Sequence, residues 1–111
     1  TESPENYVGP LEIDHNYPPN RFHLSNAYPN PFNPKTNFSL VMPNNSQVSI
    51  SIFDILGRQV HKLHQGILVK GRHNFTWNGK NSSGNALSSG TYFVLVKSNN
   101  HSEIQKLLML K

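Results

Sequence analysis

The sequence predicts an all-β protein: an immunoglobulin-like antiparallel β-sandwich of about seven strands, preceded by an extended N-terminal arm. Three observations support this prediction. Apolar and polar residues alternate in short runs, turn residues separate these runs about every 8–12 residues, and no useful length of sequence has a helical period. Only 14% of the 111 residues are charged, whereas Asn, Ser, Gly and Pro are abundant. This composition is typical of one small domain of short strands joined by many turns.

Residues 1–21 are predicted to form an extended, Pro-rich acidic arm or linker, and residues 22–111 the sandwich. Residues 1–20 contain four acids and no Lys or Arg, which gives a net charge of −4. Residues 21–111 contain ten Lys and Arg against two acids, which gives +8. Such asymmetry indicates that the arm has a role of its own. The chain begins with Thr1 rather than Met, which is typical of a processed product or an excised fragment.

A faint two-residue alternation in the arm places Tyr7, Leu11 and Ile13 on one face. Pro10 restricts such a strand to a sheet edge, because proline cannot donate a ladder hydrogen bond. A solvated linker is the commoner outcome for this composition. Our interpretation is that the arm docks, with Tyr7, Leu11 and Ile13 as the docking residues.

The most informative stretch of the body is Tyr28-Pro29-Asn30-Pro31-Phe32-Asn33-Pro34. Three prolines at alternate positions exclude a helix, because each lacks a backbone donor and fixes its own φ. Each proline also moves the residue before it toward extended geometry. The segment is therefore predicted to be a stiff, extended lead-in with two aromatic rings available as anchors.

The strands that follow are short alternating runs, of which residues 48–53 form the clearest, with one apolar face and one mostly serine face. At the turn over residues 54–58, Gly57 can supply positive φ and the Asp54 carboxylate can accept backbone N–H bonds. Asn78-Gly79 is a strong tight-turn pair, and residues 80–90 are expected to be a loop. The predicted strands are residues 38–42, 48–53, 60–63, 67–69, 75–77, 92–97 and 104–110.

The core is expected to form from the inward rows of these strands. Trp77 is the only tryptophan and lies in the middle of the pattern, so we expect it to be a central anchor. The core anchors predicted from the sequence are Phe32, Ile50, Ile52, Trp77 and Tyr92.

The residues for catalysis are scarce. The chain has no cysteine, which excludes disulfides, thiolate metal sites and cysteine nucleophiles. The body holds only Asp54 and Glu103 as carboxylates, too few for an acid/base pair. We therefore expect no enzyme activity, no cofactor and no small-molecule substrate.

Metal binding is also disfavoured. His61 and His64 are three residues apart on a predicted strand, so they are expected to point to opposite faces. The other four histidines lack ligand-like neighbours, and we interpret them as surface or rim residues. Residues 78–84 resemble an oxygen-ligand loop for calcium, but Asn in place of Asp removes charge that such a site needs. An Asx-turn loop is favoured, and calcium in this loop stays open.

Two further partner classes are not expected. The basic residues are scattered singly, without a cluster or an interleaved aromatic platform, so nucleic-acid binding is not predicted. No apolar run approaches the length of a membrane helix.

Six motifs follow one another along the body: residues 28–34 with Thr36, residues 52–60, residues 71–73, residues 77–79, residues 89–93 and residues 106–111. In order and spacing they resemble the type IX secretion system C-terminal sorting domain, across about residues 22–111. The flagellar hook-capping immunoglobulin-like domain is a related fold with similar segments. Asn78 and Asn81 depart from the acidic residues common in that loop, which weakens the calcium inference.

The resemblance implies a bacterial β-sandwich module that directs its cargo across the outer membrane for secretion or cell-surface attachment. We expect such a module to act through contacts with the secretion machinery or with other copies of itself, and to touch the outer-membrane surface only indirectly. By the same resemblance, the export-recognition candidates are Lys106, Leu108, Leu110 and Lys111. Core packing is the simpler explanation for most of the leucines in this run.

A second hypothesis treats the chain as a structural subunit of an extracellular filament. The N-terminal arm would add as a strand to the sheet edge of a neighbouring copy, in the manner of donor-strand exchange. The opposite charges of arm and body favour such contacts.

Overall fold

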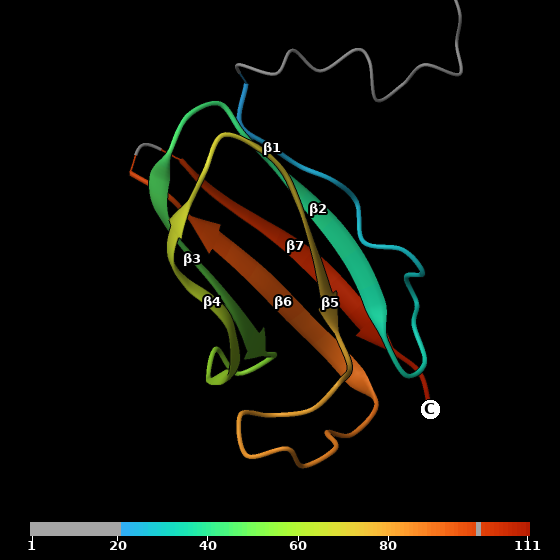
Figure 1. Ribbon diagram of the computed structural model, residues 1–111. Coiled ribbons are helices and arrows are strands. Elements are labelled where there is room, and N and C mark those ends of the chain that lie inside the picture. Colours follow the sequence, from blue (N-terminus) through green and yellow to red (C-terminus); the bar gives the residue numbers. More distant parts are fainter. Residues whose placement is uncertain (1–20, 100) are drawn as a thin grey trace, which may run out of the picture.

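The computed structural model describes residues 21–99 and 101–111, which form a sandwich of two antiparallel sheets (Figure 1). The described residues contain seven strands and no helix, so the all-β immunoglobulin-like prediction is confirmed. One sheet has the order β1-β2-β5 and the other the order β4-β3-β6-β7. The strands are β1 His23–Leu24, β2 Thr36–Met42, β3 Ser46–Asp54, β4 Gln59–Leu68, β5 Gly71–Trp77, β6 Gly90–Lys97 and β7 Ser102–Met109.

The strand number agrees with the prediction, but two of the strands differ. β1 was not predicted, because a strand of two residues carries no readable alternation; it forms where His23 and Leu24 pair with Val41 and Leu40 of β2. The runs at residues 60–63 and 67–69 are one strand, β4, which pairs with β3 along its length. No helix in the described part of the chain is long and apolar enough to span a membrane.

The core lies between the inward rows of the two sheets. β3 contributes Val48, Ile50 and Ile52, all fully buried, and β6 contributes Val94 and Val96 in the same way. The five residues expected as core anchors are all buried: Phe32, Ile50, Ile52, Trp77 and Tyr92.

His61 and His64 lie on the same face, contrary to the prediction from their odd spacing. Ile52 pairs with His61 and Ile50 with His64, so the register shifts by one residue between these pairs. A bulge of this kind places an extra residue in one strand, so two residues an odd number of positions apart can face the same way when it lies between them. Both histidines therefore share the inward face of Ile50 and Ile52. His61 Nδ1 is buried without a hydrogen-bond partner, and the His64 ring lies 6.0 Å from that of Phe75.

The β3–β4 turn has the hydrogen bonds that the sequence predicts. Asp54 Oδ1 accepts the backbone N–H of Leu56 at 3.0 Å and of Arg58 at 2.9 Å. The Arg58 Nε donates to Asp54 Oδ2 at 2.9 Å, and Gly57 has a φ of +85°. The backbone N–H of Arg58, followed by its guanidinium and the Leu56 N–H, holds the pKa of Asp54 below its ordinary value of 3.8.

We predict that Trp77→Ala lowers the free energy of unfolding by about 3–5 kcal/mol, because the substitution empties the centre of the core. Trp77→Phe should cost less, since it keeps an aromatic ring in the same space. Urea titration followed by far-UV circular dichroism measures both losses without relying on tryptophan fluorescence. A loss below about 1 kcal/mol for Trp77→Ala would contradict the central placement.

The depressed pKa of Asp54 predicts a pH dependence. A carboxylate whose pKa is lower in the folded chain than in the unfolded chain stabilises the fold when the pH is above the unfolded pKa. This stabilisation is lost as the pH falls through the folded pKa. The melting temperature of the native chain should therefore exceed that of Asp54→Asn most at about pH 6 and least at about pH 2.5. A difference that stays constant across this range would show that ionised Asp54 does not stabilise the turn.

Candidate functional site

Two of the export-recognition candidates, Lys106 and Leu108, lie in β7 on the side that faces away from the core. The other two, Leu110 and Lys111, follow the strand and are exposed. Leu107 and Met109 point inward and are buried to 0% and 1% exposure. Lys106 is exposed, Leu108 is half-buried and Leu110 is 51% exposed. Core packing thus explains Leu107 but not Leu108 or Leu110, contrary to the simpler explanation drawn from the sequence.

The edge of β7 that faces away from β6 pairs with the proline segment, which we define as residues 28–34. β7 pairs with β6 on one side only. On the other side, Phe32 N–H donates to the Leu108 carbonyl at 2.9 Å, and Leu110 N–H donates to the Phe32 carbonyl at 3.0 Å. The Phe32 side chain is 2% exposed, and its ring centre lies 5.6 Å from that of Trp77. The backbone of Phe32 therefore bonds to the edge of β7, and its ring packs in the core.

The Asn30 side chain extends this pairing by acting in place of a peptide group. Its Nδ2 donates to the Lys106 carbonyl at 2.9 Å, and its Oδ1 accepts the Leu108 N–H at 2.9 Å. Together with Phe32, Asn30 provides a partner for four edge groups of β7. An edge whose groups are already paired offers no template for an additional strand.

The proline segment is bent, and the predicted extended lead-in is wrong. Its backbone pairs with β2 at Tyr28, through two hydrogen bonds with Asn37, and with β7 at Phe32. Because β2 and β7 belong to different sheets, a chain that pairs with both must turn between them. Only one of the two rings is an anchor, since Tyr28 is 79% exposed.

Motifs that are far apart in the sequence meet at this end of the sandwich. The Trp77 Nε1 donates to the Lys80 carbonyl at 3.0 Å, and the Trp77 ring lies 5.2 Å from that of Tyr92. Gly79 has a φ of +74°, and a Cβ at this position would lie 2.9 Å from the Met109 sulfur. The tight turn therefore requires glycine for both its conformation and its contact with β7.

The remaining sequence-predicted positions do not join this cluster. Asn81 Oδ1 accepts the backbone N–H of Ser83 and Asn85, which is the hydrogen bonding of an Asx-turn. Within residues 21–99 and 101–111, no group of three or more His, Asp or Glu side chains is placed to hold a metal. Tyr7, Leu11 and Ile13, the predicted docking residues of the arm, lie outside the described residues.

Two residues of the site were not singled out from the sequence. Asn30 lies between two prolines that cannot donate, and this context indicates that its side chain supplies the missing hydrogen bonds. Gln105 has no comparable signal: its Nε2 donates to the Ser25 carbonyl at 2.9 Å, and its Oε1 accepts the Ala27 N–H. Both side chains hold β7 to the chain that precedes β2.

We predict that Asn30→Ala weakens the outer edge of β7. The free energy of unfolding should fall by about 1–2 kcal/mol, since two hydrogen bonds are lost. Amide exchange at Leu108 should become at least about tenfold faster through local opening. Hydrogen-exchange NMR measures the second effect.

Asn33→Ala is the matched control, because Asn33 is exposed, lies in the same segment and has no side-chain hydrogen bond among the described residues. It should change stability by less than about 0.5 kcal/mol. Equal exchange at Leu108 in the two variants would exclude the proposed role of Asn30.

Comparison with known proteins identifies the scaffold. FlgD from P. aeruginosa is 29% identical with a TM-score of 0.53, over 67% of this chain and 59% of that chain. PorZ from Porphyromonas gingivalis is 24% identical with a TM-score of 0.51, over 81% of this chain and 11% of that chain. PorU from the same organism is 20% identical with a TM-score of 0.58, over 76% of this chain and 9% of that chain.

The present chain thus spans less than two thirds of each of these structures. No curated protein matches it. The model of the FlgD Ig-like domain matches residues 25–102 and ends where β7 begins. Because this match covers more than half of the sequence, the chain belongs to the FlgD Ig-like domain family.

Proposed function

We propose that this chain is a sorting module of a type IX secretion system and that the outer side of β7 is what the export machinery recognises. The observation that carries the proposal is that half-buried Leu108 and exposed Leu110 face away from the core, at the end of a strand whose outer edge is already paired there. Folding requires Leu107 and Met109 in the core, but it gives no reason for apolar side chains at the two outward positions. An exposed apolar row beside Lys106 and Lys111 has the chemistry of a protein contact.

The structural neighbours support this assignment through the fold. PorZ is described as an essential bacterial surface component of the type IX secretion system of Porphyromonas gingivalis, and PorU comes from the same organism. The present chain carries the same Ig-like scaffold, and its terminal motif resembles that of sorting domains. We infer that it is exported and held at or released from the cell surface, and that it acts through protein contacts rather than catalysis.

The test uses a reporter protein joined upstream of the chain in a bacterium with a working type IX system. Leu108→Ser with Leu110→Ser should lower export of the reporter at least about tenfold, equivalent to about 1.4 kcal/mol of lost recognition. The precursor should then accumulate in the periplasm. Both substitutions leave Leu107 and Met109 in place, so the fold should be retained, and a thermal melt of the purified variant checks this.

Ile67→Ser with Val69→Ser is the matched control. These two side chains are 67% and 56% exposed, and they lie at the far end of β4 and just after it. The control should be exported as the native chain is. Normal export of the Leu108 and Leu110 variant, with its fold intact, would rule out recognition through the outer side of β7.

A further inference from the structure

The outer face of the four-stranded sheet carries an apolar cluster that the core does not use. We define the outer patch as Phe53 of β3, Ile55 of the following turn, Phe93 and Leu95 of β6, and Ile104 of β7. Ile55 and Ile104 are 66% and 65% exposed, and the other three are half-buried. The patch lines an open hollow of about 240 Å³. A connected apolar surface of this kind is typical of a contact site.

Lysines surround the outer patch. One cross-strand row runs Lys62–Ser51–Leu95–Ile104. The row on one side of it ends with Lys106, which pairs with Phe93. The row on the other side contains Lys97, which pairs with Ser49. These rows hold no carboxylate, and Asp54 at the rim of the hollow is paired with Arg58. The face therefore fits a segment that is apolar on one side and negatively charged.

The N-terminal arm of the chain has this composition. Leu11 and Ile13 alternate with Glu12 and Asp14, and residues 1–20 carry a net charge of −4. Residues 21–111 carry +8. Long lysine side chains at the rim of a sheet face can extend past an apolar contact and reach carboxylates on the far side of the bound segment.

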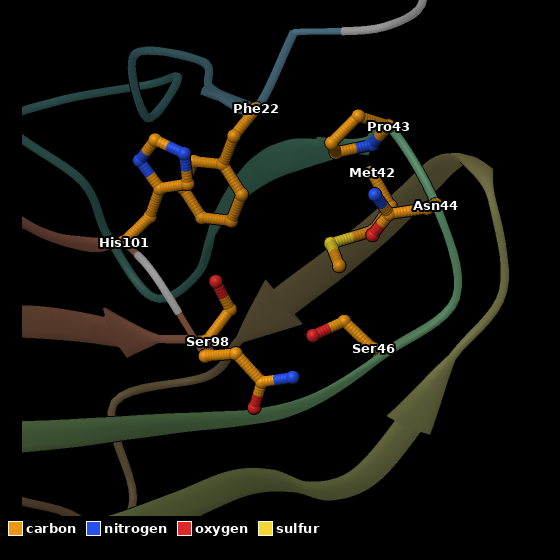
Figure 2. Close-up of a pocket in the computed structure, with 8 residues that line it drawn as sticks. Phe22, Met42, Pro43, Asn44, Ser46, Ser98 and His101 are labelled. Carbon is orange, nitrogen blue, oxygen red and sulfur yellow. The ribbon is translucent and has the colours of Figure 1, made fainter.

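The arm joins the fold at the end of the sandwich where β7 begins. Figure 2 shows the Phe22 and His101 rings side by side, and their centres are 4.9 Å apart. His101 immediately precedes β7, and Ile104 follows three residues later, about 10 Å along an extended strand. The six residues between Asp14 and Arg21 span up to about 20 Å when extended. The arm is therefore long enough to bring Leu11 and Ile13 onto the patch of its own chain.

We propose that residues 7–14 dock on the outer patch of the same molecule, with Leu11 and Ile13 against Phe93, Leu95 and Ile104. The acids of the arm lie near the lysines that surround the patch. The docking itself does not depend on the proposed export function, and the test below does not involve export.

The absence of cysteine from the chain allows a direct test by disulfide trapping. In the full chain, Leu11→Cys is combined with Leu95→Cys and equilibrated in a glutathione buffer. The effective concentration of the two thiols is then read from the oxidised fraction by mass spectrometry. Docking predicts a value at least about tenfold above that of a freely tethered pair, which is in the millimolar range.

Leu11→Cys with Asn74→Cys is the matched control. Asn74 is exposed on β5 in the other sheet, and it pairs with Ser39, two residues from the β2 position that pairs with His23. The arm therefore begins near both cysteine positions. Adding Glu12→Lys and Asp14→Lys to the Leu95→Cys pair should lower its effective concentration toward that of the control.

Three outcomes would overturn the proposal. Equal effective concentrations for the Leu95→Cys and Asn74→Cys pairs would show a free arm. A preference for Asn74→Cys would place the arm on the other sheet or on the β5 edge. Disulfides that form between chains and increase with protein concentration would assign the patch to the arm of a second copy.

Discussion

The pairing of the outer edge of β7 with Asn30 and Phe32 is the constraint on which the terminal strand depends. A C-terminal strand bonded to one neighbour leaves a row of donors and acceptors open to water or to another chain. Four hydrogen bonds from the proline segment occupy this row. The same segment inserts the Phe32 ring beside Trp77. The position of the strand and the packing of the core are therefore set by one short stretch of chain, and Lys106, Leu108 and Leu110 keep a fixed orientation.

The sequence was sufficient to predict the sandwich because most strands bury one face, which leaves a two-residue alternation in β3 and β6. The sequence was insufficient where the pairing between strands, rather than the local residue pattern, determines the structure. β1 is a strand only because β2 lies beside it. The facing of His61 and His64 depends on a one-residue bulge opposite Ile50 and Ile52, and a bulge has no reliable local signature. The polar residues between 63 and 67 concealed the continuity of β4.

The candidate site was predictable in position but not in detail. The run Leu107-Leu108-Met109-Leu110 is apolar at every residue, so alternation cannot say which side faces the core. The pairing of β7 with β6 settles it: Leu107 lies opposite the inward Tyr92, and Leu108 lies opposite the outward Thr91. The contribution of Gln105 could not be predicted, because its partners Ser25 and Ala27 are about 80 residues away and belong to no strand.

The two sides of the same strands contribute differently to the fold. Inward residues of β3, β6 and β7 fill the core, and their outward neighbours include Phe53, Phe93 and Ile104, which the core does not need. Single exposed apolar residues are ordinary on protein surfaces, whereas a connected group that spans three strands is not. Because the core is filled without these outward residues, substitutions at their positions leave its packing in place.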